Sequence, residues 1–532
     1  MSTEVIIDGH SLDLDQIERV AHEEATVAIA PEARRRVEAS RLTIERVIER
    51  GASVYGVNTG FGRFSDVVIP PEDVVRLQRN LIVSHAAGAG EPFPVPVVRA
   101  MILLRANALA LGHSGVRPVV IETLVGMLNR GVHPVVPQKG SLGASGDLAP
   151  LAHLALVALG LGEAYHGGRR SPGAEAMATA GLRPLTLEAK EGLALINGTQ
   201  TMTAVAALTL AAAGRLLILA DASGALTLEA LQGIPLAFDP RLQAVRGHPG
   251  QEASARRLRG MLEGSQLVTR PGELRTQDAY ALRCMPQVHG ASGDAIDYAT
   301  AVVLREANAA TDNPLVFPDD EAVISGGNFH GQPVAIAMDL AGIALAELGS
   351  ISERRVERLV NPQLSGLPAF LTRNGGLNSG LMLAQYTAAA LVSEDKILAS
   401  PASVDSIPSS ANQEDHVSMG TIAARKAAEI LTNVQTVLAI ELLCAAQAVD
   451  LAVEARSPAG GAGGTADAVG GRPEELLGRG TRALYQQVRG RVPGLQDDRV
   501  LAGDIEAIRS GITAGRDHSW WAAVGIDPAG PE

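Results

Sequence analysis

A tripeptide of small residues, Ala-Ser-Gly, occurs three times in this sequence, and its surroundings decide whether any copy can do chemistry. One copy lies in "GSLGASGDLAPL" (140–151), one lies at 222–224, and one belongs to "GASGD" at 290–294. Chance copies are expected in a chain with 57 glycines. The copy at 222–224 is embedded in a helical pattern. The copy at 290–294 precedes a helical pattern, where Ser292 or Asp294 would cap the helix.

The copy at 144–146 follows a loop that is punctuated by glycine and leads into a predicted helix. If the loop is compressed, the amide nitrogen of Gly146 can attack the carbonyl carbon of Ala144 and close a five-membered ring with loss of water. Dehydration of Ser145 then leaves an exocyclic methylene, a strong electrophile that ordinary side chains cannot supply. Its place at a helix N-terminus suits a developing negative charge. The alternative is a plain helix cap.

A second stretch, "YGVNTGFGRF" at 55–64, concentrates aromatic residues between glycines. The chain has only 15 aromatic residues (2 Trp, 6 Tyr and 7 Phe), and three of them lie here. Glycine allows backbone conformations that other residues resist, so a mobile loop could carry Tyr55 over a site as a base. The alternative is an irregular surface loop anchored by Phe61.

The elements that must position these loops are predicted to be helices. Hydrophobic residues make up 46% of the 532 residues and aromatic residues 3%, which is typical of long packed helices. We expect a mainly α fold: an elongated helical bundle (111–532) that carries the loop at 140–151, and a smaller N-terminal α+β head (1–110) that carries the tyrosine loop. Wide apolar stripes suggest burial between subunits. Apolar residues recur at three- and four-residue steps in Val97–Leu111, Leu148–Gly162, Thr199–Leu231, Val334–Val360, Leu381–Leu398 and Ile422–Ala455.

Charge and cysteine content argue against several classes of partner. The chain carries 45 basic and 58 acidic residues, a net charge of −13, without a basic run, so we expect no nucleic acid and no membrane partner. Cys284 and Cys444 cannot form a disulfide framework, and the first residues lack the apolar core of a signal peptide. We therefore expect a cytoplasmic protein. The 12 histidines show no metal-binding spacing, so we expect no metal.

The motif at 140–151 resembles the cofactor-forming signature of the aromatic amino acid ammonia-lyases. The resemblance extends over nearly the whole chain, in seven further blocks that follow the family's order. Several blocks in order are far more specific than one tripeptide. The fumarase and aspartase group is an alternative class of lyase, but its signature loop is not visible here. The seven blocks are "YGVNTGFG" (55–62), "SHAAGAGEP" (84–92), "KEGLALINGTQ" (190–200), "QDAYALRCMPQV" (277–288), "DNPLVF" (312–317), "GGNFHGQPVA" (326–335) and "SVDSIPSSANQEDHVSMG" (403–420).

The resemblance implies a cofactor that the chain makes from itself. In the family, Ala-Ser-Gly becomes a methylidene-imidazolone group autocatalytically, and the matching residues here are Ala144, Ser145 and Gly146. No external cofactor is implied. The resemblance also implies a helical homotetramer in which several subunits contribute to each active site. The copy at 290–294 falls where the family has no cofactor.

Two positions of the resemblance point to the substrate. Ser84-His85 is similar to the histidine-specific members, where the histidine contacts an imidazole, and Glu414 is similar to their acidic residue. A carboxylate beside an imidazole accepts its N–H, whereas beside a phenyl ring it would be costly. The resemblance therefore implies elimination of ammonia from L-histidine to give trans-urocanate, the first step of histidine degradation. Met285 and Gly331-Gln332 depart from many histidine-specific members, so tyrosine, phenylalanine or an imidazole analogue, and aminomutase chemistry, stay alternatives.

The same blocks imply roles for further residues. Tyr55 would remove the β-proton of the substrate, which requires a phenol pKa below its usual value of about 10. Arg283 would bind the substrate carboxylate through paired hydrogen bonds, and its alternative is a surface ion pair. Attack on the cofactor by the substrate's amine and by its ring are both open. Four more residues resemble family positions at the cofactor and substrate: Asn197, Gln277, Tyr280 and Phe329.

Overall fold

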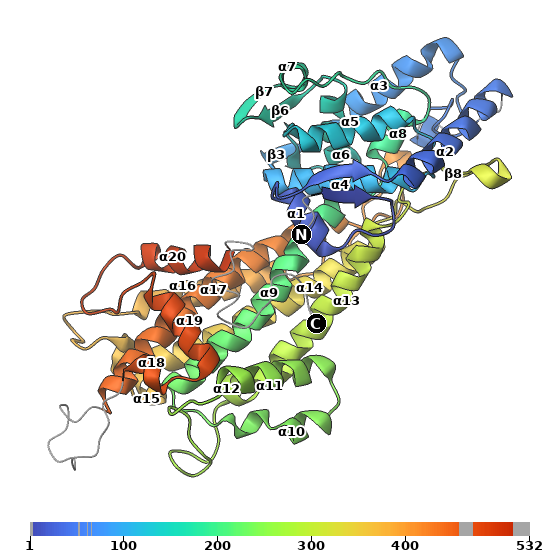
Figure 1. Ribbon diagram of the computed structural model, residues 1–532. Helices are drawn as coiled ribbons and strands as arrows, with labels where there is room; N and C mark the ends of the chain where they lie inside the picture. The colour runs from blue at the N-terminus through green and yellow to red at the C-terminus, as the bar shows by residue number, and fades with distance from the viewer. Residues whose placement is uncertain (1–3, 52–53, 61, 65, 457–471, 514–532) are drawn as a thin grey trace, which may run out of the picture. The chain divides into compact units, whose positions relative to one another are not determined.

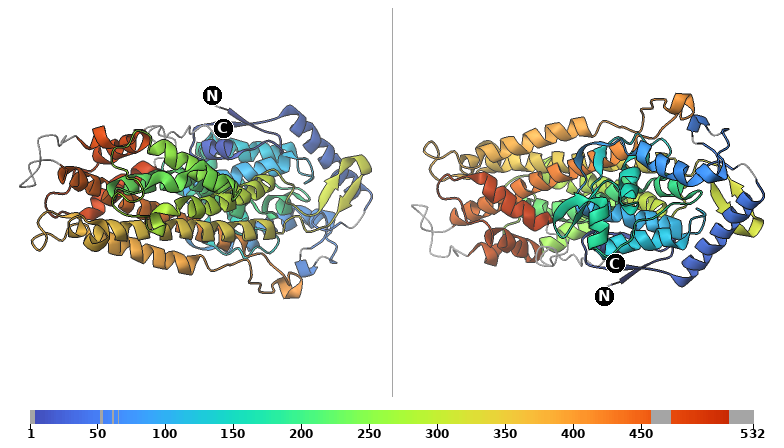
Figure 2. Two further views of the ribbon diagram at one scale, coloured as in Figure 1. Left: turned by 90° about the horizontal axis from the view of Figure 1, so that it is seen from below. Right: turned by 90° about the horizontal axis from the view of Figure 1, so that it is seen from above.

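The computed structural model describes residues 4–51, 54–60, 62–64, 66–456 and 472–513 (Figures 1 and 2). Most of these residues lie in helices, and the strands are short. The prediction of a mainly α fold is therefore confirmed. Phe61, the expected anchor of the tyrosine loop, lies outside the described residues.

The chain divides into two compact units, each made of segments that are distant in sequence. Unit 1 continues well past residue 110, where the expected head would end, because α4 (Val95–Ala110) packs against α5 (Pro118–Asn129) within it. Unit 1 comprises Met1–Ala211, Ala299–Asp339 and Pro401–Lys426, and unit 2 comprises Ala212–Tyr298, Leu340–Ser400 and Ala427–Glu532.

Unit 1 combines short helices with small sheets. Helix α4 is apolar around most of its surface and almost entirely buried, as expected for a helix inside a unit. The other helices are α1 (Leu14–Ala21), α2 (Pro31–Glu49), α3 (Val74–His85), α5, α6 (Leu148–Ala158), α7 (Gly173–Thr179) and α8 (Glu191–Ile196). The strand pairs are β1 (Glu4–Ile7) with β2 (Thr26–Ile29), in parallel, and, antiparallel, β3 (Ala89–Pro92) with β5 (Pro137–Lys139), β4 (His133–Pro134) with β6 (Glu163–His166), β6 with β7 (Arg169–Pro172), and β8 (Leu315–Phe317) with β9 (Ala322–Ile324).

Four long helices have residues in both units, and the copy of the tripeptide at 222–224 lies inside one of them, as predicted. They are α9 (Gln200–Ala230), α13 (Met285–Ala307), α14 (Gln332–Val360) and α17 (Gly420–Glu454). The remaining helices belong to unit 2: α10 (Pro240–Ala244), α11 (Pro249–Met261), α12 (Tyr280–Arg283), α15 (Pro362–Ser365), α16 (Met382–Leu398), α18 (Pro473–Leu476), α19 (Arg479–Arg489) and α20 (Leu501–Thr513).

A buried ion pair joins three of the long helices inside unit 2. Arg355 on α14 donates to both carboxylate oxygens of Glu441 on α17, at 2.6 and 2.8 Å. Thr227 on α9 donates to Glu441 at 2.8 Å, and Ser352 on α14 donates to it at 2.6 Å. A buried carboxylate is tolerated when its oxygens are paired in this way. Helices α9, α14 and α17 therefore lie side by side here, as the views in Figures 1 and 2 show.

Three helices, α9, α14 and α17, are long and apolar enough to cross a membrane by length and composition. Most of each apolar stretch is buried inside the protein: 67% in α9, 67% in α14 and 89% in α17. Protein therefore covers the larger part of each apolar stretch. This agrees with the expectation that these segments are buried helices.

The third copy of the tripeptide lies inside α13, so the prediction that Ser292 or Asp294 caps a helix is wrong. Gly290 approaches α11 so closely that a Cβ there would lie 2.3 Å from the amide nitrogen of Gln251. The Ser292 hydroxyl donates to the carbonyl of Ala344 at 3.0 Å. The helix continues through this stretch because its small residues serve close packing.

We expect Gly290→Ala to lower the free energy of unfolding by about 1–3 kcal/mol, because the added methyl group has no room against α11. The matched control is Gly260→Ala on α11, where a Cβ would have no neighbour within 4 Å and alanine favours the helix. Denaturant unfolding of both variants beside the parent measures the difference. Equal stability of the two variants would contradict this packing.

Candidate active site

The predicted cofactor-forming tripeptide lies in a strained loop that leads into α6. Ser145 has a φ of +52°, a left-handed conformation that a residue with a side chain rarely adopts. Gly143 and Gly146 on either side have φ values of +81° and +76°. The backbone therefore bends sharply at the tripeptide.

Two contacts hold this loop so closely that only glycine fits. Gly146 forms a parallel backbone bridge with Gly198, and a Cβ at Gly146 would lie 2.2 Å from the Gly198 carbonyl oxygen. A Cβ at Gly143 would lie 2.2 Å from the hydroxyl of Ser418. Real Cβ atoms do not approach other atoms this closely, so a side chain at either position would push the loop away from its neighbours.

Asp147 stands at the N-cap position of α6 but makes no side-chain bond to the first turn. Its Oδ1 instead accepts from the Ser141 hydroxyl at 2.8 Å and from the Thr421 hydroxyl, and its Oδ2 accepts from the Met202 amide at 2.8 Å. Burial raises the pKa of the Asp147 carboxyl, and these hydrogen bonds lower it in part. The helix-cap alternative is therefore wrong for Asp147, which ties the loop to two other segments.

Glu414 reaches the same loop. Its Oε1 accepts from the Ser145 hydroxyl at 3.1 Å, and its Oε2 accepts from the Ser409 hydroxyl at 2.9 Å. The backbones of Ser409 and Glu414 also pair with each other, which fixes the direction of the carboxylate. The residue expected to hold an imidazole thus lies beside the residue expected to become the electrophile.

His85 is the last residue of α3, and its ring is held by that helix. Its Nδ1 lies 2.8 Å from the carbonyl oxygen of Leu81 and 3.1 Å from the Ser84 hydroxyl. Burial lowers the pKa of His85, while the Leu81 carbonyl and the charge of Glu414 act in the opposite direction. When Nδ1 donates to Leu81, Nε2 stays an acceptor. A carboxylate and a neutral imidazole are therefore presented in one region.

Tyr55 lies in unit 1, half-buried, with its hydroxyl 3.5 Å from the Gly62 amide that donates to it. Burial raises the pKa of Tyr55, and the carboxylates of Glu414 and Asp312 raise it further, whereas the Gly62 amide lowers it. The net direction is upward. This is opposite to the lowered pKa expected of a base, because both charged groups acting on the phenol here are negative.

Asn197 and Phe329 also belong to unit 1. Asn197 follows α8, is buried, and donates from Nδ2 to the Asn313 carbonyl at 3.3 Å. Its Oδ1 is buried without a hydrogen-bond partner among the described residues, which suits a position that awaits a ligand or a modified neighbour. Phe329 is half-buried in the loop that precedes α14. Its expected place at the cofactor and substrate stays a prediction.

The other three expected residues form a group of their own in unit 2. Gln277 is exposed, and Tyr280 at the start of α12 is 71% exposed. The Arg283 guanidinium lies 4.6 Å from the centre of the Tyr280 ring, and its Nε is buried without a hydrogen-bond partner among the described residues. Arg283 therefore makes a cation–π contact rather than the surface ion pair that was its alternative.

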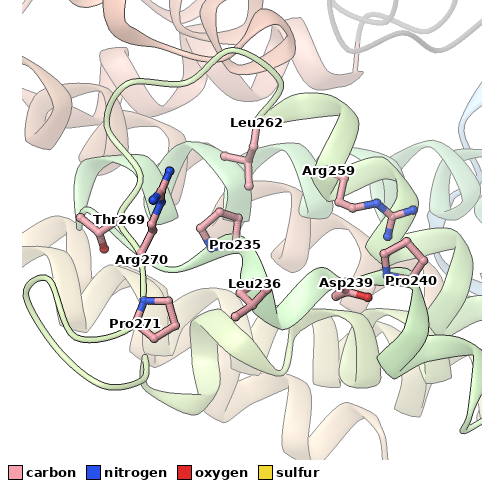
Figure 3. Close-up of a pocket in the computed structure, with 9 residues that line it drawn as sticks. All are labelled: Pro235, Leu236, Asp239, Pro240, Arg259, Leu262, Thr269, Arg270 and Pro271. Carbon is pink, nitrogen blue, oxygen red and sulfur yellow. The ribbon is translucent and has the colours of Figure 1, made fainter.

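A shallow cavity of about 540 Å³ in unit 2 is a separate feature (Figure 3). Figure 3 shows Leu236, Leu262 and three prolines along it, with Arg259, Asp239 and Arg270 at its margins. Its lining includes none of the expected catalytic or substrate-binding residues. The candidate site is therefore defined by the strained loop and its neighbours in unit 1, and not by this cavity.

The sequence did not reveal the residues that hold the loop in place without taking part in the proposed reaction. Ser141 and Ser409 lie inside motifs that were noticed, and Thr421 directly follows one of them. Their positions in the motifs marked the right regions. Their roles became visible only through the distances to Asp147 and Glu414.

Comparison with known proteins identifies the family of the chain. The sequence model of a family described as aromatic amino acid lyase matches residues 12–489. This match covers far more than half of the chain, and the chain therefore belongs to the aromatic amino acid lyase family.

Particular members of the family resemble the chain over nearly its whole length. A histidine ammonia-lyase of Symbiobacterium thermophilum is 60% identical over 94% of this chain and 95% of that protein. The crystal structure of histidine ammonia-lyase from Trypanosoma cruzi is 42% identical, with a TM-score of 0.88 over 99% of this chain and 96% of that one. A tyrosine aminomutase from Streptomyces globisporus is 38% identical, with a TM-score of 0.90 over 98% of both chains.

The raised pKa of Tyr55 predicts how activity depends on pH. A base must be deprotonated, and the phenolate fraction grows as pH rises towards a pKa above the ordinary value of 10. We therefore expect kcat/KM to increase from neutral to alkaline pH, and Tyr55→Phe to remove this limb of the profile. Rates measured at several pH values test this. A profile that is flat above neutral pH would show that the pKa of Tyr55 is lowered in the active enzyme.

Proposed function

We propose that the chain eliminates ammonia from L-histidine to give trans-urocanate, the first step of histidine degradation. The observation that carries this proposal is the hydrogen bond from the Ser145 hydroxyl to Glu414, with His85 in the same electrostatic environment. A carboxylate and a neutral imidazole suit the two ring nitrogens of a histidine substrate. Beside an apolar phenyl ring the same carboxylate would be poorly solvated. The name of the relative at 60% identity supports this substrate.

We propose that Ala144, Ser145 and Gly146 form a methylidene-imidazolone group autocatalytically and that no external cofactor is needed. The residues present fit this group, since the loop is already bent at Ser145 and no Cβ obstructs Gly146. Once formed, the group supplies an electrophile that makes ammonia a better leaving group. Asp147, next to the tripeptide, fixes the loop through its contacts with Ser141, Thr421 and Met202.

The resemblance to the family supports the following roles for the other side chains. Tyr55 takes the β-proton of the substrate, and Arg283 binds its carboxylate through paired hydrogen bonds. His85 and Glu414 hold the imidazole. Three further residues surround the substrate and the modified loop in this proposal: Asn197, Gln277 and Tyr280. Phe329 covers the electrophile and excludes water from it.

We further propose a homotetramer with shared active sites, located in the cytoplasm, without nucleic-acid or membrane partners. Helix α16 presents large apolar side chains to solvent, with Leu383 51%, Tyr386 58% and Ile397 73% exposed. Such patches mark association surfaces in proteins of this kind. Light scattering should give the mass of four chains. A monomer with full activity would contradict shared sites.

The proposed substrate predicts a selective assay. L-histidine, L-tyrosine and L-phenylalanine are supplied separately, and conjugated products are followed by ultraviolet absorbance. We expect product from histidine alone, and none from Ser145→Ala. Glu414→Gln should lower kcat/KM for histidine by about 100-fold, because a charge-assisted hydrogen bond to the ring is lost. Product from tyrosine or phenylalanine, with histidine inert, would contradict the roles given to His85 and Glu414.

A further inference from the structure

A cluster of buried charges lies in unit 1 behind the strained loop, and no role proposed so far uses it. Arg105 on α4, Lys190 at the start of α8 and Asp312 are each at most 1% exposed. Lys190 Nζ donates to Asp312 Oδ2 at 2.6 Å. Lys190 is thus paired with Asp312, and the charge of Asp312 also acts on the buried Arg105. Burying such a cluster costs free energy, so its presence indicates a structural or functional role.

Arg105 donates hydrogen bonds to the segment that carries Asn197. Its Nη1 donates to the Asn197 carbonyl at 2.7 Å and to the Gln200 side-chain oxygen at 2.9 Å. Its Nε and Nη2 are buried and find no hydrogen-bond partner among the described residues. Burial lowers the pKa of Arg105 to about 10, so the side chain is still a cation at neutral pH. Arg105 is thus a charged donor aimed at one short backbone segment.

The segment held by Arg105 is the surface against which the cofactor-forming loop rests. Gly198 forms the backbone bridge with Gly146, and its carbonyl oxygen accepts from the Asp147 amide at 2.7 Å. A Cβ at Gly198 would lie 2.5 Å from Nη1 of Arg105. One backbone residue therefore separates the guanidinium from the residue whose amide nitrogen would close the ring.

We propose, building on the function proposed above, that Arg105 is a positioning residue for both ring closure and turnover. It holds Asn197 and Gly198 in place, so that Gly198 keeps Gly146 bent towards Ala144 and Asn197 keeps its unpaired Oδ1 directed at the site. Arg105 touches neither the reacting atoms nor the substrate. Lys190 and Asp312 keep the cluster anchored from the other side of the segment.

The planar guanidinium fixes the directions of the two N–H bonds of Nη1, which an ammonium group does not. One planar nitrogen of Arg105 reaches a backbone carbonyl and a side-chain amide oxygen at once. An ammonium group on a shorter stem is a point charge without this fixed fork. Arg105→Lys should therefore keep the buried charge but hold the segment less well, whereas Arg105→Met should lose both.

The same helix offers a matched control. Arg99 on α4 is also buried, at 3% exposure, and donates to the backbone carbonyls of Val20 and Leu128 at 2.8 and 3.1 Å. Its partners lie away from the 197–200 segment. Arg99→Met and Arg99→Lys therefore impose the same kind of loss on the fold without touching the positions that hold the tripeptide.

The test compares the four variants with the wild-type chain by intact mass, thermal unfolding, and kcat and KM for L-histidine. We expect Arg105→Met to melt cooperatively. Most of its chains should keep the full translated mass, because the two water molecules that ring closure and dehydration remove are not lost. Those chains that do mature should show kcat lower by about 100-fold, with a smaller change in KM, because the site is misplaced rather than emptied. Arg105→Lys should recover part of both losses. Arg99→Met should lower the melting temperature yet mature fully and keep its kcat.

Full maturation and unchanged kcat in Arg105→Met would overturn the inference, as would equal losses in Arg99→Met. If Arg105→Met does not fold, the comparison of Arg105→Lys with Arg99→Lys tests the inference instead. A mature mass and a wild-type kcat in Arg105→Lys would then overturn the inference. A wild-type chain that lacks two waters but leaves histidine unchanged refutes the proposed substrate alone. The masses of the variants then still decide the role of Arg105.

Discussion

The backbone contact between Gly146 and Gly198 is the constraint on which the rest of the candidate site depends. It brings a residue before α6 against the residue that follows Asn197, although 52 positions separate them in the printed sequence. The contact requires a glycine at 146, because a Cβ there would lie 2.2 Å from the Gly198 carbonyl oxygen. Gly146 is the last residue of the tripeptide, and Ser145 directly before it has a positive φ. The strain is local, and the surrounding hydrogen bonds sustain it.

The carboxylates around the loop are fixed in place by hydrogen bonds. Asp147 is buried among three hydrogen-bond donors, and burial raises its pKa. Glu306, whose pKa is also raised by burial, accepts from the Thr199 hydroxyl at 2.5 Å. Glu414 is directed by Ser409. Burial raises the pKa of the Tyr55 phenol, and the charges of Glu414 and Asp312 raise it further.

Much of the fold was predictable from the sequence because apolar spacing marks long helices directly. The predicted helix at 199–231 became Gln200–Ala230, and the one at 381–398 became Met382–Leu398. The stretch at 290–294 was mistaken for a helix start because Gly, Ser and Asp favour caps. Only the contact of Gly290 with Gln251 shows why the helix runs through it. The division into units also escaped prediction, since it joins segments distant in sequence.

The sequence motifs point to particular candidate site residues, but not to the electrostatics around them. Motif order identified Ser145, His85 and Glu414, and the structure brings all three into one region. The direction of the Tyr55 pKa was not predictable, because it depends on burial and on Asp312, which is 257 positions away in the printed sequence. Arg105 gave no signal in the sequence, since an arginine in an apolar helix is normally at the surface.

The central claim is that the tripeptide at 144–146 closes into an electrophile, and intact mass of the purified protein tests it most directly. The account predicts a mass below that of the translated chain by two water molecules, with the loss confined to the peptide that contains Ser145. Full translated mass in a folded, cooperative protein would contradict the account. The strained loop would then be a structural turn, and the chemistry proposed for it would have no electrophile.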